Sequence, residues 1–235
     1  GLMNLVQERT PRINSVETIG LKVGHLTMPA GAQCHMDVIE TMVNVEADIL
    51  EYEIIYADPP WHYATRKTGT NFGGGITDKY PSMSIKEMCD LPVQDWAADN
   101  SMLFMWTTMP YLEKSFEVIN AWGFEYKTMA FTWVKMNKTN PSFFKGVGNW
   151  TKSNAELCLF ARRGKVLPRA NKDVAQVIME HRREHSRKPD RVRDDIVRLC
   201  GDRPRLEMFA RTATPGWDVW GNETNKFVEE QVNGI

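Results

Sequence analysis

One stretch of the chain reads Glu53-Ile54-Ile55-Tyr56-Ala57-Asp58-Pro59-Pro60-Trp61. It begins with a short, mainly apolar run of the kind found in a strand that is buried on both faces of a sheet. Two prolines follow, and proline cannot continue the hydrogen-bond ladder of a sheet, so the chain must leave the sheet there. The stretch therefore predicts a central strand that ends in a carboxylate, Asp58.

The rest of the chain alternates between predicted strands and helices. A capping box at Ser84 and Glu87 predicts the start of a short helix, and helical spacing of apolar residues predicts longer helices over 111–122 and 189–200, the latter with Pro189 as its first residue. Strands are predicted over residues 53–57, 101–106, 126–134, 156–161, 206–209 and 217–220. This order predicts an α/β three-layer sandwich whose sheet is at least partly parallel, and in such sheets ligands bind beyond the carboxyl ends of the strands.

The composition excludes several classes of protein. A chain of 235 residues with 42% hydrophobic and 25% charged residues is typical of a globular protein, and no run of 18 apolar residues predicts a membrane span. The first residues lack the pattern of a secretory signal, so we expect an intracellular protein, cytoplasmic if bacterial or phage. The four cysteines show no CxxC spacing, which argues against a zinc ribbon, a redox pair or a disulfide framework and predicts reduced, mostly packed thiols.

Two segments have a composition that favours contact with phosphates. Residues 162–198 hold twelve Lys or Arg against six Asp or Glu, and residues 66–79, which are rich in Gly, Thr and Lys, are expected to form a loop. Taken alone, the first segment is more often a solvated helical face. Residues 137–152 are predicted to form a further polar loop.

The residues after the first strand suit the handling of an aromatic amine. Such an amine is a poor nucleophile because its lone pair is delocalised into the ring, so a site must hold its N–H groups with acceptors. Asp58 offers a carboxylate, the stiff backbone directs the carbonyl of Pro59, and Trp61 offers a flat face for a base extruded from its stack. The competing interpretation is a Pro-Pro turn that closes a strand, with Trp61 in the core.

The chain resembles one family from Tyr52 to Glu223, the adenine-N6 methyltransferases named for the seventy-kilodalton subunit of the mRNA adenosine methyltransferase. The motifs that carry the resemblance are Tyr56-Ala57-Asp58-Pro59-Pro60-Trp61, Tyr80-Pro81-Ser82-Met83-Ser84, Leu103-Phe104-Met105-Trp106, Ala121-Trp122-Gly123-Phe124-Glu125-Tyr126, Trp133-Val134-Lys135, His185-Ser186-Arg187-Lys188-Pro189-Asp190, Glu207-Met208-Phe209-Ala210-Arg211 and Gly216-Trp217-Asp218-Val219-Trp220-Gly221-Asn222-Glu223.

The resemblance implies a Rossmann-like methyltransferase fold with permuted motif order, in which the catalytic tetrad precedes the main cofactor-binding segment. It implies S-adenosylmethionine as cofactor and no metal, because the cofactor itself carries the activated methyl group. The catalytic domain is expected over residues 51–225, with an N-terminal extension of unclear role over 1–50 and a C-terminal tail over 226–235.

The resemblance also assigns roles to single residues. The catalytic tetrad is Asp58, Pro59, Pro60 and Trp61, in which Asp58 and Pro59 hold the target amine while Trp61 and Tyr80 line the base pocket. Lys188 contacts cofactor and substrate together, and looser alignment places Glu156 and Ser186 at the substrate adenosine. The cofactor-binding set is Asp58, Lys188, Glu207, Arg211, Asn222 and Glu223, with Glu207 supporting Arg211.

The chain departs from the family pattern at two places. After Arg211 the eukaryotic catalytic subunit has a proline and a polar pair, where this chain has Thr212-Ala213-Thr214. The acidic residue that binds the adenine side of the cofactor upstream of the tetrad has three candidates, Asp37, Glu40 and Asp48.

Other functions compete with this interpretation. His181-Arg182-Arg183-Glu184-His185 matches the HxxEH pattern of zinc peptidases, in which both histidines share one helical face. The family also includes catalytically silent subunits that bind nucleic acid, but these have lost the aspartate or the aromatic residue of the tetrad, and both are present here.

The expected partner is nucleic acid, with a homodimer or a related methyltransferase-like subunit as a further possibility and no membrane. DNA is favoured over RNA, because the strongest likeness is to compact bacterial and phage members that are expected to act on DNA. In either case the target adenine must be single-stranded or flipped out of its stack.

Overall fold

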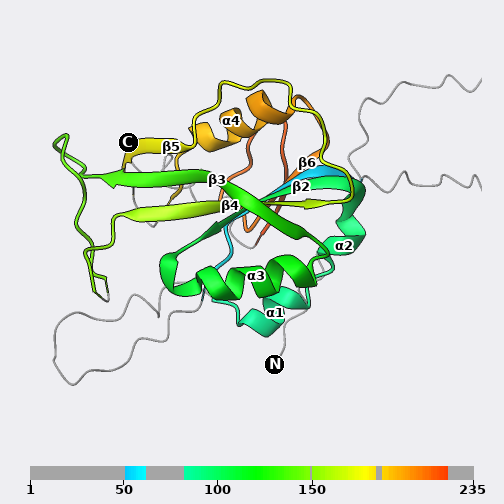
Figure 1. The fold of residues 1–235 in the computed structure, drawn as a ribbon, viewed down its shortest axis with the longest axis horizontal. Helices are drawn as coiled ribbons and strands as arrows, with labels where there is room; N and C mark the ends of the chain where they lie inside the picture. Colours follow the sequence, from blue (N-terminus) through cyan, green and yellow to red (C-terminus); the bar gives the residue numbers. More distant parts are fainter. Residues whose placement is uncertain (1–50, 62–81, 149, 184–186, 222–235) are drawn as a thin grey trace, which may run out of the picture. The chain divides into compact units, whose positions relative to one another are not determined.

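The computed structural model describes residues 51–61, 82–148, 150–183 and 187–221. All of them belong to the second of the two units into which the chain divides, Glu51–Ile235. The elements in chain order are β1 (Tyr52–Ala57), α1 (Ile85–Cys89), α2 (Val93–Trp96), β2 (Ala97–Thr107), the 3₁₀ turn η2 (Met109–Tyr111), α3 (Leu112–Ala121), β3 (Glu125–Met136), β4 (Ala155–Arg163), β5 (Val177–His181), α4 (Arg191–Cys200), β6 (Arg205–Met208) and β7 (Asp218–Trp220) (Figure 1).

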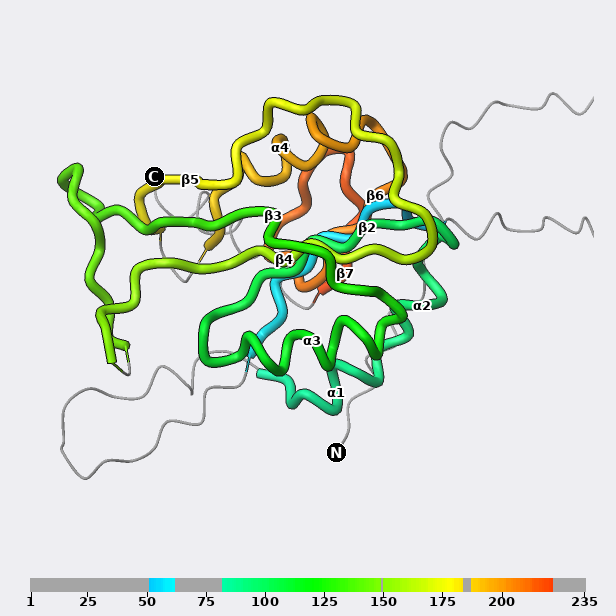
Figure 2. Tube along the Cα trace, viewed as in Figure 1, coloured from blue at the N-terminus to red at the C-terminus, as the bar shows by residue number. Residues whose placement is uncertain are grey.

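The strands form one seven-stranded sheet in the order β5-β3-β4-β2-β1-β6-β7. β1 pairs in parallel with β2 and β6, and β7 continues the parallel part beyond β6. β4 is antiparallel to both β2 and β3, so the sheet is mixed, as expected. β1 and β6 lie side by side although about 150 residues separate them, a neighbourhood that the trace in Figure 2 makes visible.

Successive residues of β1 point to opposite faces of the sheet, and each face has its own apolar layer. Ile55 packs in a cluster with Met88 of α1 and Val118 of α3. Ile54 packs in a second cluster with Val192 of α4. Helices α1 and α3 therefore cover one face and α4 the other, which confirms the predicted three-layer α/β sandwich (Figure 1).

The local signals located most elements correctly. The capping box is formed, since the Ser84 hydroxyl accepts from the Glu87 amide and the Glu87 carboxylate accepts from the Ser84 amide. All six predicted strands are present, with β2 and β3 longer than predicted. Helix α4 begins at Arg191 with Asp190 as its N-cap, so the prediction that Pro189 is the first helical residue was wrong.

Strand β5 was not predicted, and it removes the metallopeptidase interpretation. His181 is the last residue of β5 and pairs with Met136 of β3, so it does not lie on a helix. Arg182 and Arg183 follow outside any helix, and the rest of the HxxEH pattern lies outside the described residues. Within the described parts of the chain, no group of three or more His, Cys, Asp or Glu side chains could hold a metal ion.

The described cysteines are free thiols. Cys158 and Cys200 are buried and Cys89 is partly buried, as predicted, while Cys34 lies outside the described residues. Burial raises the pKa of both Cys158 and Cys200. None of the described helices is both long and apolar enough to cross a membrane.

Candidate active site

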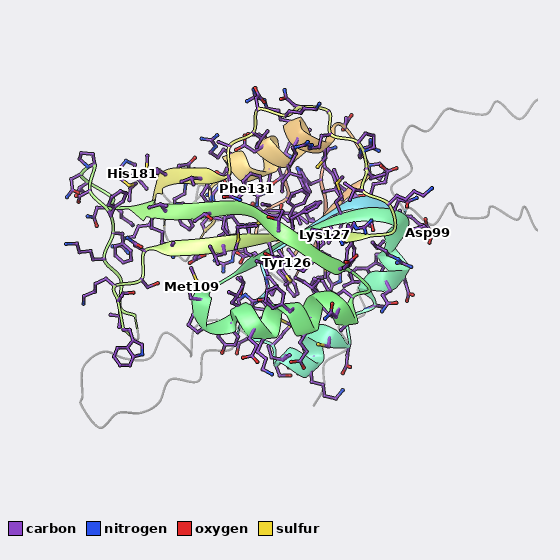
Figure 3. All side chains as sticks on the ribbon, viewed as in Figure 1. Asp99, Met109, Tyr126, Lys127, Phe131 and His181 are labelled. Atoms are coloured by element: carbon purple, nitrogen blue, oxygen red, sulfur yellow. The ribbon has the colours of Figure 1, made fainter. Side chains whose placement is uncertain are left out.

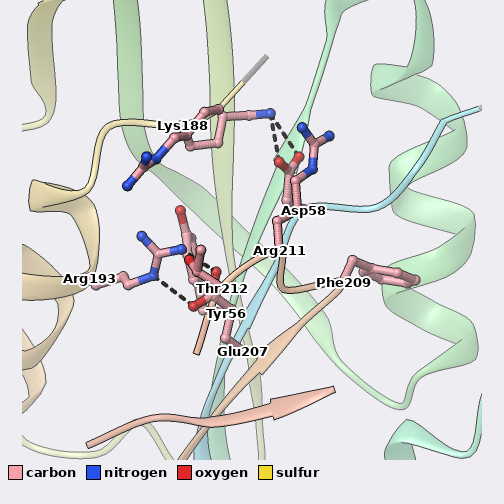
Figure 4. Close-up of a pocket in the computed structure, with 9 residues that line it drawn as sticks. Tyr56, Asp58, Lys188, Arg193, Glu207, Phe209, Arg211 and Thr212 are labelled. Carbon is pink, nitrogen blue, oxygen red and sulfur yellow. Dashed lines mark hydrogen bonds and ion pairs between the residues drawn. The ribbon is translucent and has the colours of Figure 1, made fainter. Parts of the chain in front are cut away.

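The carboxyl end of β1 lies at a pocket. Ala57 pairs with Met105 of β2 and with Met208 of β6, so the carboxyl ends of three parallel strands lie side by side at one end of the sheet. The backbone amide of Asp58 donates to the carbonyl of Met208 and fixes the first residue beyond the strand. The pocket at this end is lined by Tyr56, Asp58, Arg187, Lys188, Arg193, Glu207, Phe209, Arg211 and Thr212 (Figure 4).

The two prolines form a tight turn whose carbonyls are already engaged. The carbonyl of Pro59 accepts from the amide of Trp61 at 2.9 Å, and that of Pro60 accepts from the amide of Met83 at 3.1 Å. A carbonyl has two lone pairs, so Pro59 keeps one acceptor position in addition to the turn bond. The turn therefore orients the tetrad through its own backbone.

Trp61 is more deeply packed than a free stacking platform would be. Its side chain is 7% exposed, and its indole N–H donates to the carbonyl of Trp106 at 3.2 Å. The ring of Tyr111 stacks on it, with ring centroids 5.4 Å apart and an interplanar angle of 23°. The stacking of a base on Trp61 stays a prediction, and Tyr111, which sequence reasoning placed only at a helix start, is part of the same aromatic group.

Asp58 is the first of four charged side chains that contact one another in turn. They are Asp58, Lys188, Glu156 and Lys135. The ammonium of Lys188 lies 2.8 and 2.9 Å from the two carboxylate oxygens of Asp58 and 3.2 Å from the carboxylate of Glu156. Glu156 is also bonded by Lys135. Three residues predicted for the site are thus brought together: Asp58 from just beyond β1, Lys188 from the segment before α4, and Glu156 from β4.

For Lys188 and Glu156, attraction between opposite charges shifts the pKa more than burial does. Burial alone would lower the pKa of Lys188, but Asp58 and Glu156 raise it above its ordinary value, so the ammonium stays charged. Burial alone would raise the pKa of Glu156, but Lys188 and Lys135 hold it below its ordinary value. Lys188 also lies over the ring of Trp106, 5.6 Å from its centroid.

A second ion pair closes the opposite side of the pocket. Two guanidinium nitrogens of Arg193 bind the two oxygens of Glu207 at 2.5 and 2.6 Å. Sequence reasoning expected Glu207 to support Arg211 and did not single out Arg193. The spacing of Arg193 three residues after Asp190 predicts only that the two side chains share one helix face, so it does not identify Glu207 as the partner.

The carboxylate of Glu207 and the hydroxyl of Tyr56 are both buried beside this pair. Burial raises the pKa of Glu207, although Arg193 opposes the effect, and burial also raises the pKa of Tyr56 well above its usual range. The Tyr56 hydroxyl accepts from the indole N–H of Trp106 at 2.7 Å. The wall of the pocket is therefore a fixed polar network.

The segment after β6 turns sharply at the pocket. Phe209 has a φ of 61°, a left-handed conformation that is uncommon for a residue other than glycine. Its ring packs edge-on against Trp220 at 5.3 Å and points away from the charged groups (Figure 4). The turn leaves Arg211 and Thr212 on the pocket wall, so the position at which the chain departs from the family pattern lines the pocket.

Several predicted residues lie outside the described part of the chain and stay predictions. They are Tyr80, Ser186, Asn222, Glu223 and the three candidates Asp37, Glu40 and Asp48.

Comparison with known families decides the assignment. A family model described as MT-A70 matches residues 52–223, which include every element of the sheet. The chain belongs to the MT-A70 family. This confirms the resemblance found in the sequence and the Rossmann-like fold that it implied.

Relatives of different size each match about three quarters of the chain. A type II methyltransferase, M.MunI, from Mycoplasma sp is 39% identical over 188 residues, which are 74% of this chain and 78% of the relative. A probable N(6)-adenosine-methyltransferase from Oryza sativa subsp. japonica is 32% identical, over 77% of this chain and 24% of the relative. The human N(6)-adenosine-methyltransferase catalytic subunit METTL3 is 28% identical, over 74% of this chain and 28% of the relative. The chain thus spans about a quarter of these two plant and animal relatives.

Proposed function

We propose that this MT-A70 protein transfers a methyl group from S-adenosylmethionine to the exocyclic N6 amine of adenine in nucleic acid, with DNA as the favoured substrate. The observation that carries the proposal is the carboxylate of Asp58, held by Lys188 at the carboxyl end of the central strand and open to the pocket. The MT-A70 match supports the reaction class.

The polar and charged groups of the pocket support the cofactor that methyltransferases of this family use. S-adenosylmethionine has an ammonium, a carboxylate, ribose hydroxyls and a sulfonium, and when bound it supplies the activated methyl group. The pocket offers the carboxylates of Asp58 and Glu207, the guanidinium of Arg211 and the hydroxyl of Thr212. Arg211 suits the carboxylate of such a ligand, and Asp58 or Glu207 suits its cationic groups.

Asp58 is the group that handles the amine. A carboxylate has about four acceptor positions, and Lys188 takes one on each oxygen. Asp58 therefore keeps positions for an N–H of the adenine amine while Lys188 fixes its direction. A hydrogen bond to this carboxylate orients the amine lone pair and gives the excess proton of the methylated nitrogen an acceptor.

Lys188 and Glu156 make this arrangement rigid. Lys188 is held between two carboxylates from neighbouring parts of the sheet, and its side chain is 11% exposed. Movement of its ammonium would break its bonds to both Asp58 and Glu156, so the two carboxylates together restrict its position. The contribution of these residues is position and electrostatics, which is what methyl transfer from an activated donor requires.

DNA is proposed because the likeness of the sequence is to compact bacterial members. The chain covers 78% of the Mycoplasma type II methyltransferase, at the higher identity, against about a quarter of the two N(6)-adenosine-methyltransferases. A binding-only subunit is disfavoured because Asp58 and Trp61 are both present and Asp58 is held in place by Lys188.

The test is methyl transfer from labelled cofactor to three substrates of the same sequence: single-stranded DNA, duplex DNA and RNA. We expect label at adenine N6 in DNA and less in RNA, with cofactor binding measured in parallel by calorimetry. Cofactor binding without transfer to any of the three would support a silent subunit instead. Faster transfer to RNA would overturn the DNA assignment but not the reaction.

A further inference from the structure

An exposed arm joins β3 to β4. It lies at the end of the sheet where the carboxyl end of β1 leads into Asp58. The arm comprises residues 137–148 and 150–154 of the described chain, and Figure 1 shows it extending beyond the body of the sheet. Thr107 at the end of β2 pairs with Leu157 near the start of β4, and the arm enters β4 at Ala155, the residue before Glu156. The arm therefore begins and ends beside the Asp58–Lys188–Glu156 cluster.

Backbone and side-chain bonds hold the arm in shape. Met136 and Phe143 form an isolated antiparallel bridge, and Gly146 and Ser153 form another. The side chain of Asn137 donates to the hydroxyl of Ser142 at 2.7 Å. At the base, the ring of His181, labelled in Figure 3, lies at the end of β5. It bonds the carbonyl of Asn137 and so ties the arm to that strand.

Two glycines allow the strands of the arm to approach closely. A Cβ atom on Gly146 would lie 2.7 Å from the carbonyl oxygen of Ser153, and one on Gly148 would lie 2.2 Å from that of Thr151. Both contacts are with backbone and are too short to exist. At these two positions the backbone packing of the arm therefore requires glycine.

The arm presents apolar side chains that the fold does not use. Trp150 is 99% exposed, Val147 94% and Phe143 51%. Exposed tryptophan is uncommon on a protein surface that has no partner, because burying its ring is favourable. These side chains are therefore accessible to a partner.

The charge of the arm is entirely positive. Residues 137–154 contain Lys138, Lys145 and Lys152 and neither Asp nor Glu. Arg182 stacks on Phe144, 4.2 Å from the ring centroid, and adds a cation at the base. Aromatic rings among cations match the faces of bases and the phosphates of a nucleic-acid strand.

The basic stretch 162–198 is less suited to that role than the sequence indicated. Many of its cations are bound to carboxylates of the same protein: Arg162 pairs with Glu125, Arg187 and Arg183 with Asp190, Arg191 with Asp195, and Arg198 with Asp173. Lys188 and Arg193 are committed inside the pocket.

We infer that the arm is a second contact for the nucleic-acid substrate, in which Trp150 stacks on a base of the strand that carries the target adenine while Lys145 and Lys152 approach the phosphates near that base. The inference rests on the proposed function. It adds Trp150 as a residue that favours a strand whose bases are splayed or unpaired. A second copy of the chain is a poorer occupant, because a two-fold contact between identical arms brings like charges together.

The test compares W150A with wild type for an unpaired oligodeoxynucleotide that contains one adenine, using fluorescence anisotropy and steady-state methyl transfer. We expect the Kd and the KM for the oligonucleotide to rise about tenfold, the order expected for one base stacked on an aromatic ring. The Kd for S-adenosylmethionine and kcat at saturating oligonucleotide should stay unchanged. The variant should fold normally, because Trp150 has almost no contact with the rest of the protein.

The double variant K145Q/K152Q tests the phosphate contacts. Its slope of log Kd against log salt should be shallower by about one to two, since each phosphate contact contributes somewhat less than one unit. The matched controls are V166A and K165Q, which change an exposed apolar residue and an exposed lysine just beyond the end of β4 that is remote from the arm. Both controls should leave the Kd and the slope as in wild type.

Two results would overturn the inference. One is a W150A protein that binds and methylates the oligonucleotide as wild type does. The other is a change of oligomeric state in sedimentation with unchanged oligonucleotide affinity per protomer, which would make the arm a protein–protein contact. Absence of methyl transfer by wild type itself, with every substrate tried, is a different outcome that counts against the proposed function.

Discussion

Two carboxylates line the same pocket from neighbouring strands, and each faces a cation. Asp58, just beyond β1, is bound by Lys188 and its side chain is 26% exposed. Glu207, in β6, is bound through both oxygens by Arg193 and its side chain is 7% exposed. Lys188 is shared with Glu156, whereas the guanidinium of Arg193 holds Glu207 in a bidentate grip.

The difference distinguishes Asp58, the carboxylate proposed to bind the amine, from Glu207, which holds the pocket wall in shape. A bidentate guanidinium pair has a fixed geometry, so Glu207 with Arg193 behaves as part of the wall. An ammonium is a point charge that can serve two acceptors, so Asp58 keeps both its orientation and free acceptor positions. Substitutions at Asp58 and Lys188 should therefore act mainly on the reaction, and substitutions at Arg193 mainly on stability.

The largest expected effect is that of D58A. Turnover should fall by about 10³-fold, the order seen when one preorganised electrostatic contact is removed from an active site. The free energy of unfolding should change little, because Lys188 still pairs with Glu156. Single-turnover methyl transfer and urea unfolding measure the two quantities, and D58N is the matched control of equal size. Wild-type turnover in D58A would refute the role assigned to Asp58.

The next effect is that of R193M on stability. Removing the guanidinium leaves Glu207 buried without its partner, which should lower the free energy of unfolding by about 3–5 kcal/mol. R193K should recover only part of this, because an ammonium cannot bind both oxygens in the same geometry. Urea unfolding checks both variants. Wild-type stability of R193M would show that Glu207 is not held as described.

K188M should lower turnover more than it lowers the free energy of unfolding, the opposite of R193M. Turnover should fall about 100-fold because Asp58 loses its orientation, while the unfolding free energy should fall less than in R193M, since Asp58 is partly exposed and Glu156 keeps Lys135. The same two assays measure both values. If K188M were destabilised as much as R193M, the distinction between the two ion pairs would be lost.

A smaller effect concerns Glu156 and pH. Its pKa is lowered in the folded state, so the stability it contributes is fully present above the ordinary value of 4.5 and is lost as pH falls through the lower, folded pKa. E156Q should therefore be less stable than wild type at pH 7, by about 2 kcal/mol, and the deficit should shrink only below pH 4.5. Urea unfolding of both proteins between pH 7 and the acid range follows the difference. A deficit that stayed constant through the acid range would contradict the assigned direction.

The smallest expected effect is that of W61F. Phenylalanine keeps an aromatic ring against Tyr111 but removes the N–H that donates to Trp106, which should cost about 1 kcal/mol of unfolding free energy. Thermal unfolding detects a change of this size. An effect on substrate KM larger than on stability would indicate that Trp61 also contacts the base directly.

Local patterns were sufficient for most of the fold because they depend on neighbours in sequence. The apolar run at 53–57 and the prolines after it located β1 and its end, and the capping box located α1. β5 was missed because only Ile178 is fully buried among its five residues, so the strand has little apolar signal.

The candidate site was predicted in part for the same reason. Asp58, Lys188 and Glu156 lie in motifs that could be recognised one by one, and the fold brings them together. The partner of Glu207 was not predictable in this way, since the choice of Arg193 depends on how α4 packs over β6. Tyr111 and Lys135 reach the site through the start of a helix and the register of β3 with β4.

The sequence by itself determined most of the order of strands and helices, with β5 and α2 as the exceptions, together with the carboxylate at the end of the central strand and the family motifs, because spacing, proline and capping act over a few residues. Only the tertiary structure decided which cation meets which carboxylate, that the cations of 162–198 are largely paired, and that Trp150 stands exposed on an all-basic arm. Pairing and exposure depend on distances between segments far apart in the chain, and those distances are set by strand register and helix packing.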